Sequence, residues 1–123
     1  MKKITFLISI SFIALGAHAQ VANSKWKTTL QLDQPVDVVF NFSTDTLDVT
    51  NPTDNSSLET MKYTLQDTVL TIQKLYGQSQ CDSNTIGSYT CTINGDEMHL
   101  KIISDDCGDR SNVIADIKLN RTQ

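Results

Sequence analysis

The sequence predicts an all-β fold, a small eight-stranded antiparallel up-and-down barrel. Apolar and polar residues alternate from Trp26 to Leu119, as in strands with one buried and one exposed face. Clusters of turn residues interrupt this alternation and leave eight short segments. Most connections have hairpin length, so successive strands can pair and close into a barrel without exposed edges. A two-sheet β-sandwich is the alternative.

The strands are assigned from the residues that share one face. The inward residues of the first four are Trp26, Thr28, Leu30 and Leu32; Val36, Val38, Phe40 and Phe42; Leu47 and Val49; and Met61, Tyr63 and Leu65. Those of the last four are Leu70 and Ile72; Tyr89, Cys91 and Ile93; Met98, Leu100 and Ile102; and Val113, Ala115, Ile117 and Leu119. Turns are predicted at Gln34-Pro35, at 51–56, at 66–68 and at Asn94-Gly95. This assignment contains no helix.

The first nineteen residues are predicted to be a secretory signal peptide. Met1-Lys2-Lys3 is a basic start, Ile4 to Leu15 is an apolar run, and Ala17-His18-Ala19 is an A-x-A cleavage site. The chain then divides into a signal peptide (1–19), a short N-terminal segment (20–24) and one barrel domain (25–123). The apolar run is too short for a permanent membrane span, and no cysteine follows it where a lipid could be attached. We expect a periplasmic or secreted protein.

The charge of the chain argues against nucleic acid as a partner. Removal of Lys2 and Lys3 with the signal peptide leaves eight of the ten Lys and Arg residues. The chain keeps all fourteen Asp and Glu residues, so its net charge is about −6. An acidic surface repels a phosphate backbone, and the sequence has no cluster of basic residues with interleaved aromatic residues.

Trp26 and Arg121 are predicted to close one end of the barrel. If strand eight runs antiparallel to strand one, the end of the last strand lies beside the start of the first. Arg121 shares the inward parity of Leu119, so its guanidinium is expected to lie across the indole of Trp26 in a cation–π contact; the alternative is an arginine at the rim that faces solvent.

These features resemble those of the lipocalin-like (calycin) barrels, in which a tryptophan opens strand one and an arginine follows strand eight. The stretch Cys81…Gly87-Ser88-Tyr89…Asp106-Cys107-Gly108-Asp109-Arg110 also resembles small exported bacterial proteins of lipocalin-like type. In those proteins a C…G-x-Y element precedes a D-x-C-x-x-R-like element. The resemblance covers most of the chain after residue 19 and implies a ligand pocket.

The register of one hairpin predicts which two of the three cysteines form a disulfide. A two-residue turn at Asn94-Gly95 pairs Ile93 with Asp96, Cys91 with Met98 and Tyr89 with Leu100. Continued further, it places residue 82 opposite Cys107, so we predict a structural disulfide between Cys81 and Cys107. This bond would attach the loop Gly77–Ile86 to the rim of the barrel. Cys91 is then a free thiol that packs in the core.

No catalytic or metal site is predicted. His99 is the one histidine left after signal removal, and it lies between inward Met98 and Leu100, so it is expected to face solvent. The acidic loop from Asp105 to Asp109 lacks the ligand spacing of an EF-hand and is interpreted as a solvated turn. We therefore expect a protein that is not an enzyme and that needs no cofactor.

A binding function remains, with either of two kinds of partner. Large inward residues either fill the barrel as a packed core or line a pocket at its open end for a small apolar molecule; the candidates are Phe40, Phe42, Met61, Tyr63 and Tyr89, with the tyrosine hydroxyls as polar groups. The alternative partner is an exported protease, inhibited through residues 20–24 or through the loop Gly77–Ile86. A structural role in the cell envelope is the third hypothesis.

Overall fold

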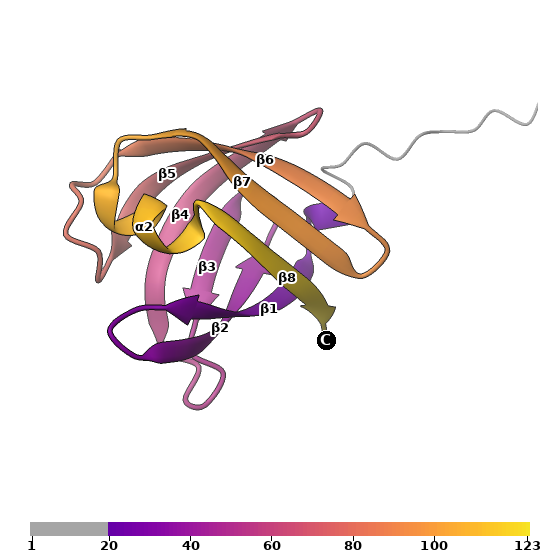
Figure 1. Cartoon of the computed structure of the whole chain (residues 1–123), viewed down its shortest axis with the longest axis horizontal. Helices are drawn as coiled ribbons and strands as arrows, with labels where there is room; N and C mark the ends of the chain where they lie inside the picture. The colour runs from indigo at the N-terminus through magenta and orange to yellow at the C-terminus, as the bar shows by residue number, and fades with distance from the viewer. Residues whose placement is uncertain (1–19) are drawn as a thin grey trace, which may run out of the picture.

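Eight antiparallel strands pair in sequence order and close into a barrel (Figure 1). The computed structural model describes residues 20–123, and the predicted signal peptide lies outside this range. The strands are β1 (Ser24–Gln31), β2 (Pro35–Phe42), β3 (Thr46–Thr50), β4 (Ser57–Gln66), β5 (Val69–Gly77), β6 (Ile86–Asn94), β7 (Glu97–Asp105) and β8 (Asp116–Thr122), and a short helix, α2 (Gly108–Ile114), precedes β8. The predicted barrel is confirmed, and the sandwich alternative is wrong.

The residues of inward parity form the hydrophobic core of the barrel. Fully buried side chains include Trp26 on β1, Phe40 on β2 and Leu100 on β7. Alternation along a strand buries every second side chain, which is the pattern from which the strands were predicted. Leu32 is an exception, because β1 ends at Gln31 and Leu32 is 50 % exposed in the turn that follows.

The helix α2 corrects the prediction for the last strand. Val113 and Ala115 were assigned to strand eight, but Val113 lies in α2, Ala115 caps its C-terminus, and β8 begins only at Asp116. The sulfur of Cys107 accepts a hydrogen bond from the backbone N–H of Arg110 at 3.4 Å and so caps the start of the helix. The stretch from Asp105 to Asp109, interpreted above as a solvated turn, thus leads into a short helix whose N-cap, Cys107, is held by a disulfide.

The register of the β6–β7 hairpin differs from the prediction by one turn position. The turn residues are Gly95 and Asp96, with Asn94 paired to Glu97, and Gly95 adopts a left-handed φ of 61° that suits glycine. The observed pairs are Ile93 with Met98, Cys91 with Leu100 and Tyr89 with Ile102, and the three predicted pairs are wrong.

The end of β7 also departs from the prediction. Ile102 was assigned inward, but it is 38 % exposed because β8 pairs with β7 only as far as the pair Lys101–Asp116. A β-bulge between Ser88 and Tyr89 shifts the register of the remaining β6–β7 pairs.

One end of the barrel is closed by the contact predicted from the sequence. Trp26 pairs with Arg121 across β1 and β8, and the Cζ atom of Arg121 lies 4.4 Å from the centroid of the indole. The indole N–H donates to Ser24 Oγ at 2.7 Å, and the Ser24 hydroxyl donates to the carbonyl of Val21. Val21 is completely buried, so residues 20–24 form part of this end.

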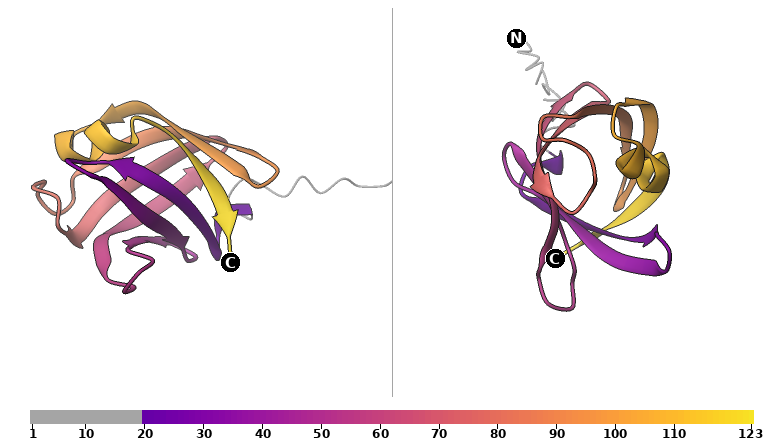
Figure 2. Two further views of the ribbon diagram at one scale, coloured as in Figure 1. Left: turned by 60° about the horizontal axis from the view of Figure 1, so that its bottom comes forward. Right: turned by 90° about the vertical axis from the view of Figure 1, so that its left-hand side faces the viewer.

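The opposite end carries the β1–β2, β3–β4 and β5–β6 loops together with α2. The right-hand view of Figure 2 looks toward this end, where the strands form a ring and α2 lies along its edge. We call it the open end. Between residues 20 and 123, no helix is long and apolar enough to cross a membrane.

Candidate ligand-binding site

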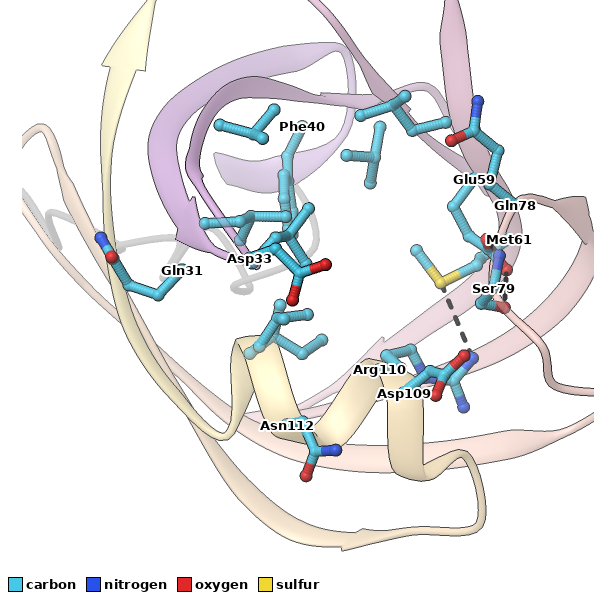
Figure 3. Close-up of a pocket in the computed structure, with 17 residues that line it drawn as sticks. Gln31, Asp33, Phe40, Glu59, Met61, Gln78, Ser79, Asp109, Arg110 and Asn112 are labelled. Carbon is cyan, nitrogen blue, oxygen red and sulfur yellow. Dashed lines mark hydrogen bonds between the residues drawn. The ribbon is translucent and has the colours of Figure 1, made fainter.

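A cavity of about 790 Å³ lies at the open end of the barrel (Figure 3). This volume falls within the range of about 300–1,000 Å³ that is common for small-molecule sites. The lining residues come from β1 to β4, from the β1–β2 and β5–β6 loops and from α2. The cavity thus opens at the end of the barrel opposite to Trp26, and its lining extends inward to Phe40, the cross-strand partner of Trp26.

The deep wall of the cavity is apolar. The barrel supplies the aliphatic and aromatic side chains Leu30, Val36, Phe40, Val49, Leu58 and Met61. The helix α2 adds Val113 and Ile114 from the other side. The alternation of the strands directs the barrel residues inward, and the short helix turns its own apolar residues toward them. The wall therefore suits an apolar ligand body.

A buried ion pair lies beside this wall. The guanidinium of Arg110 donates from Nε to Asp105 Oδ2 and from Nη2 to Asp105 Oδ1, each at 2.8 Å. The Asp105 side chain is fully buried, and that of Arg110 is 6 % exposed. Asp105 also accepts from the N–H of Cys107 at 2.8 Å and from the hydroxyl of Tyr89, so four donors share its two oxygens.

This network changes the proton affinities of its acidic members. Burial by itself raises the pKa of Asp105, but the hydrogen bonds from Arg110, Tyr89 and the Cys107 N–H together hold the pKa below its ordinary value. Burial, followed by the hydrogen bond to Asp105, raises the pKa of the Tyr89 phenol. Asp105 is therefore ionised and Tyr89 is neutral at physiological pH.

Gly87 lies so close to the Asp105 carboxylate that no side chain fits at this position. A Cβ atom on Gly87 would lie 2.5 Å from the carboxyl carbon of Asp105. Gly87 pairs with Asp105 across β6 and β7, so the glycine makes space for the carboxylate.

A second buried cation holds the β5–β6 loop at the rim. Lys74 Nζ donates to the carbonyls of Ser79 and Cys81, both at 2.7 Å, and to Ser79 Oγ at 3.0 Å. Glu59 Oε1 lies 3.6 Å from the same ammonium and accepts from Ser79 Oγ at 2.9 Å. The lysine charge is thus balanced, and the loop backbone is held in one place.

The predicted disulfide between Cys81 and Cys107 is confirmed, with a Cα–Cα distance of 5.6 Å. Its bond joins the β5–β6 loop to the start of α2. The N–H of Gln80 adds a hydrogen bond to Asp109 Oδ2 at 2.8 Å. Two segments of the rim that are far apart in the sequence are therefore linked covalently and by hydrogen bonding.

The structure brings only some of the predicted ligand-binding residues to the cavity. Phe40 and Met61 line it. Phe42 and Tyr63 pack edge to face against each other, with ring centroids 5.1 Å apart, and lie outside the lining. Phe42 pairs with Ser24, which places it near the closed end. The hydroxyls of Tyr63 and Tyr89 donate to the Ser43 carbonyl and to Asp105, so both are already engaged within the protein.

Several lining residues were missed by the sequence analysis. Leu30, Val36 and Val49 were predicted to face inward but were not assigned to a pocket. Arg110, Val113 and Ile114 belong to α2, which was not predicted. The signal that could have located them is the predicted Cys81–Cys107 bond, which fixes the chain after Cys107 to the rim.

The residues considered for catalysis lie elsewhere. His99 Nε2 is 2.5 Å from Asp116 Oδ1, and both side chains are partly exposed on the outside of β7 and β8. Cys91 is a buried free cysteine, and burial raises the pKa of its thiol to about 11. Among the described residues, no group of three or more His, Cys, Asp and Glu side chains is placed to hold a metal ion.

Comparisons of the chain with protein-family models, with curated proteins and with solved structures found no match. The class of protein is therefore defined by its fold alone, a closed eight-stranded antiparallel barrel consistent with the lipocalin-like type.

Proposed function

We propose that this protein binds a small apolar molecule in the cavity at the open end of the barrel. The observation that carries the proposal is an apolar wall around a volume of about 790 Å³ at the open end of the barrel, opposite to the Trp26–Arg121 contact. Burying an apolar ligand body against such a wall is favourable by about 25 cal/mol per Å² of apolar surface removed from water.

The construction of the rim supports a preformed site. The Cys81–Cys107 bond and the hydrogen bonds of Lys74 hold the β5–β6 loop and α2 in place before a ligand arrives. Fewer degrees of freedom are then lost on binding, which favours affinity.

Protease inhibition is less well supported by the contacts of the two candidate segments. Val21 is completely buried, so residues 20–24 are held against the barrel. The β5–β6 loop is directed by its hydrogen bonds and its disulfide toward the cavity rim, where Gln78 and Ser79 form part of the lining.

The proposal is tested with the uncharged fluorescent probe N-phenyl-1-naphthylamine. We expect saturable binding with one site per chain and a rise in probe fluorescence. The variant Leu58→Trp enlarges a half-buried side chain of the cavity wall and is expected to abolish binding. Leu75→Trp is the matched control, because Leu75 lies outside the lining and is 38 % exposed. Equal binding by the wild type and both variants would refute the cavity as the site.

A further inference from the structure

The guanidinium of Arg110 has one nitrogen that its ion pair does not use. Nε and Nη2 donate to Asp105, and Nη2 also donates to the carbonyl of Thr85 at 3.2 Å. Nη1 donates to Met61 Sδ at 3.8 Å, its one acceptor within residues 20–123, and both Arg110 and Met61 line the cavity. Figure 3 shows the two side chains pointing toward each other beside the open volume. A thioether is a weak acceptor, so Nη1 retains donor capacity toward the cavity.

The charges around the cavity restrict the kind of acceptor that fits there. The Arg110 charge is balanced by Asp105, and the Lys74 charge by Glu59. Asp33 and Asp109 also line the cavity, and neither forms an ion pair with another described residue. The site therefore offers an N–H donor without excess positive charge. A buried carboxylate would meet net negative charge, whereas an uncharged oxygen would not.

We infer that the ligand carries an uncharged acceptor oxygen, such as that of a ketone, ester, amide or alcohol, and that Arg110 Nη1 donates to this oxygen while the apolar wall holds the rest of the molecule. This inference rests on the proposed function. It makes Arg110 a specificity-determining residue, and it separates the ligand class from free carboxylic acids and from pure hydrocarbons.

The test uses three probes of nearly equal shape. They are 2-acetylnaphthalene with an uncharged carbonyl, 2-ethylnaphthalene with a methylene in its place, and 2-naphthoate with a carboxylate. Each is titrated into the full barrel with its disulfide intact, and nitrogen-15 NMR follows the guanidinium signals of Arg110. We expect 2-acetylnaphthalene to shift the Nη signals, 2-ethylnaphthalene to bind without shifting them, and 2-naphthoate to bind at least about tenfold more weakly than the ketone.

A substitution at Met61 gives an independent readout that leaves the ion pair intact. Met61→Leu removes the sulfur acceptor with little change in volume. We expect the ratio of ketone affinity to hydrocarbon affinity to rise by about threefold or more, because the freed N–H gains a better partner. Met98→Leu is the matched control, since Met98 is completely buried near the closed end and is absent from the lining.

The outcomes separate the inference from the proposed function. If ketone and hydrocarbon both bind in the cavity with the same Arg110 spectrum and the same ratio in Met61→Leu, Arg110 recognition is refuted and the apolar site stands. If 2-naphthoate binds more tightly than the ketone, the uncharged class is refuted. If none of the three probes binds, the proposed function fails together with the inference.

Discussion

The guanidinium of Arg121 lies over the indole of Trp26, with Cζ 4.4 Å from the ring centroid, and this contact closes one end of the barrel. The two residues are also cross-strand partners in the short β1–β8 ladder, which contains three residue pairs. The side chain of Arg121 is 37 % exposed, and its Nε lies 3.5 Å from Asp96. The closed end thus combines a completely buried ring with a cation that still reaches solvent.

Replacing Arg121 with alanine is expected to lower the free energy of unfolding by about 0.5–2 kcal/mol, because the cation–π contact is lost. The sole tryptophan of the chain reports the change directly. Its fluorescence emission should move to longer wavelength as water reaches the indole. Lys118→Ala is the control, since it removes an exposed basic side chain from the same strand. Unchanged emission and stability in Arg121→Ala would contradict the role of this pair.

The Asp105→Asn variant tests the buried ion pair. It leaves the Arg110 charge without its counter-ion, which is expected to cost about 3–5 kcal/mol of stability at neutral pH. Asp106→Asn, an exposed neighbour, should change stability by less than about 0.5 kcal/mol. Denaturant unfolding measures both, and a cost below 1 kcal/mol for Asp105→Asn would contradict the account.

The same pair predicts the pH dependence of stability. The pKa of Asp105 is lower in the folded protein than its ordinary value of about 4, so its contribution is fully present above about pH 4. That contribution is lost as the pH falls from about 4 through the folded-state pKa. The stability difference between the wild type and Asp105→Asn should therefore shrink in acid. A constant difference from pH 7 to pH 2 would show that Asp105 is not the titrating group.

Removing the disulfide is expected to destabilise the protein by about 3.5 kcal/mol, from the loop entropy of a cross-link that spans 26 residues. The double variant Cys81→Ser, Cys107→Ser keeps an oxygen at the N-cap of α2, so the loss is assigned to the cross-link rather than to the cap. Urea unfolding of the two proteins gives the difference. Equal midpoints with equal slopes would contradict this prediction.

The free cysteine is expected to be unreactive in the folded protein. Burial raises the pKa of the Cys91 thiol to about 11, so almost none of it is thiolate at pH 8. A thiol-specific chromogenic reagent should find no reactive group in the native state and one per chain in urea without reductant. Three thiols in urea would show that Cys81 and Cys107 are reduced.

The fold could be predicted from the sequence because strand parity is a local property. One face of each strand is buried, so the apolar side chains of Trp26, Phe40 and Leu100 indicate which face of their strand points inward. The exact hairpin register could not be predicted in the same way, since the turn moved by one position to Gly95 and a bulge followed at Ser88 and Tyr89. The Cys81–Cys107 pairing was nevertheless predicted correctly. Cys81 lies in the loop between β5 and β6, outside the paired part of the hairpin, and this loop is held at the rim beside Cys107.

The cavity was only partly predictable, for two physical reasons. Parity says that a residue faces inward but not how far along the barrel axis it lies, so Phe42 and Tyr63 were grouped with Phe40 although they lie toward the closed end. The helix α2 depends on a cap and on a long-range disulfide, which local patterns do not contain. Val113 has a spacing that fits a strand as well as a helix.

The central claim is that an apolar molecule binds at the open end, and its most direct test is amide chemical-shift mapping with 2-ethylnaphthalene. We predict saturable shifts confined to the open end, in the β1–β2 turn, the start of β4 and α2, with Asp67 and Gly95 at the other end unmoved. Shifts centred on the closed end or on the outer face of the barrel, or none at saturating probe, would contradict the account.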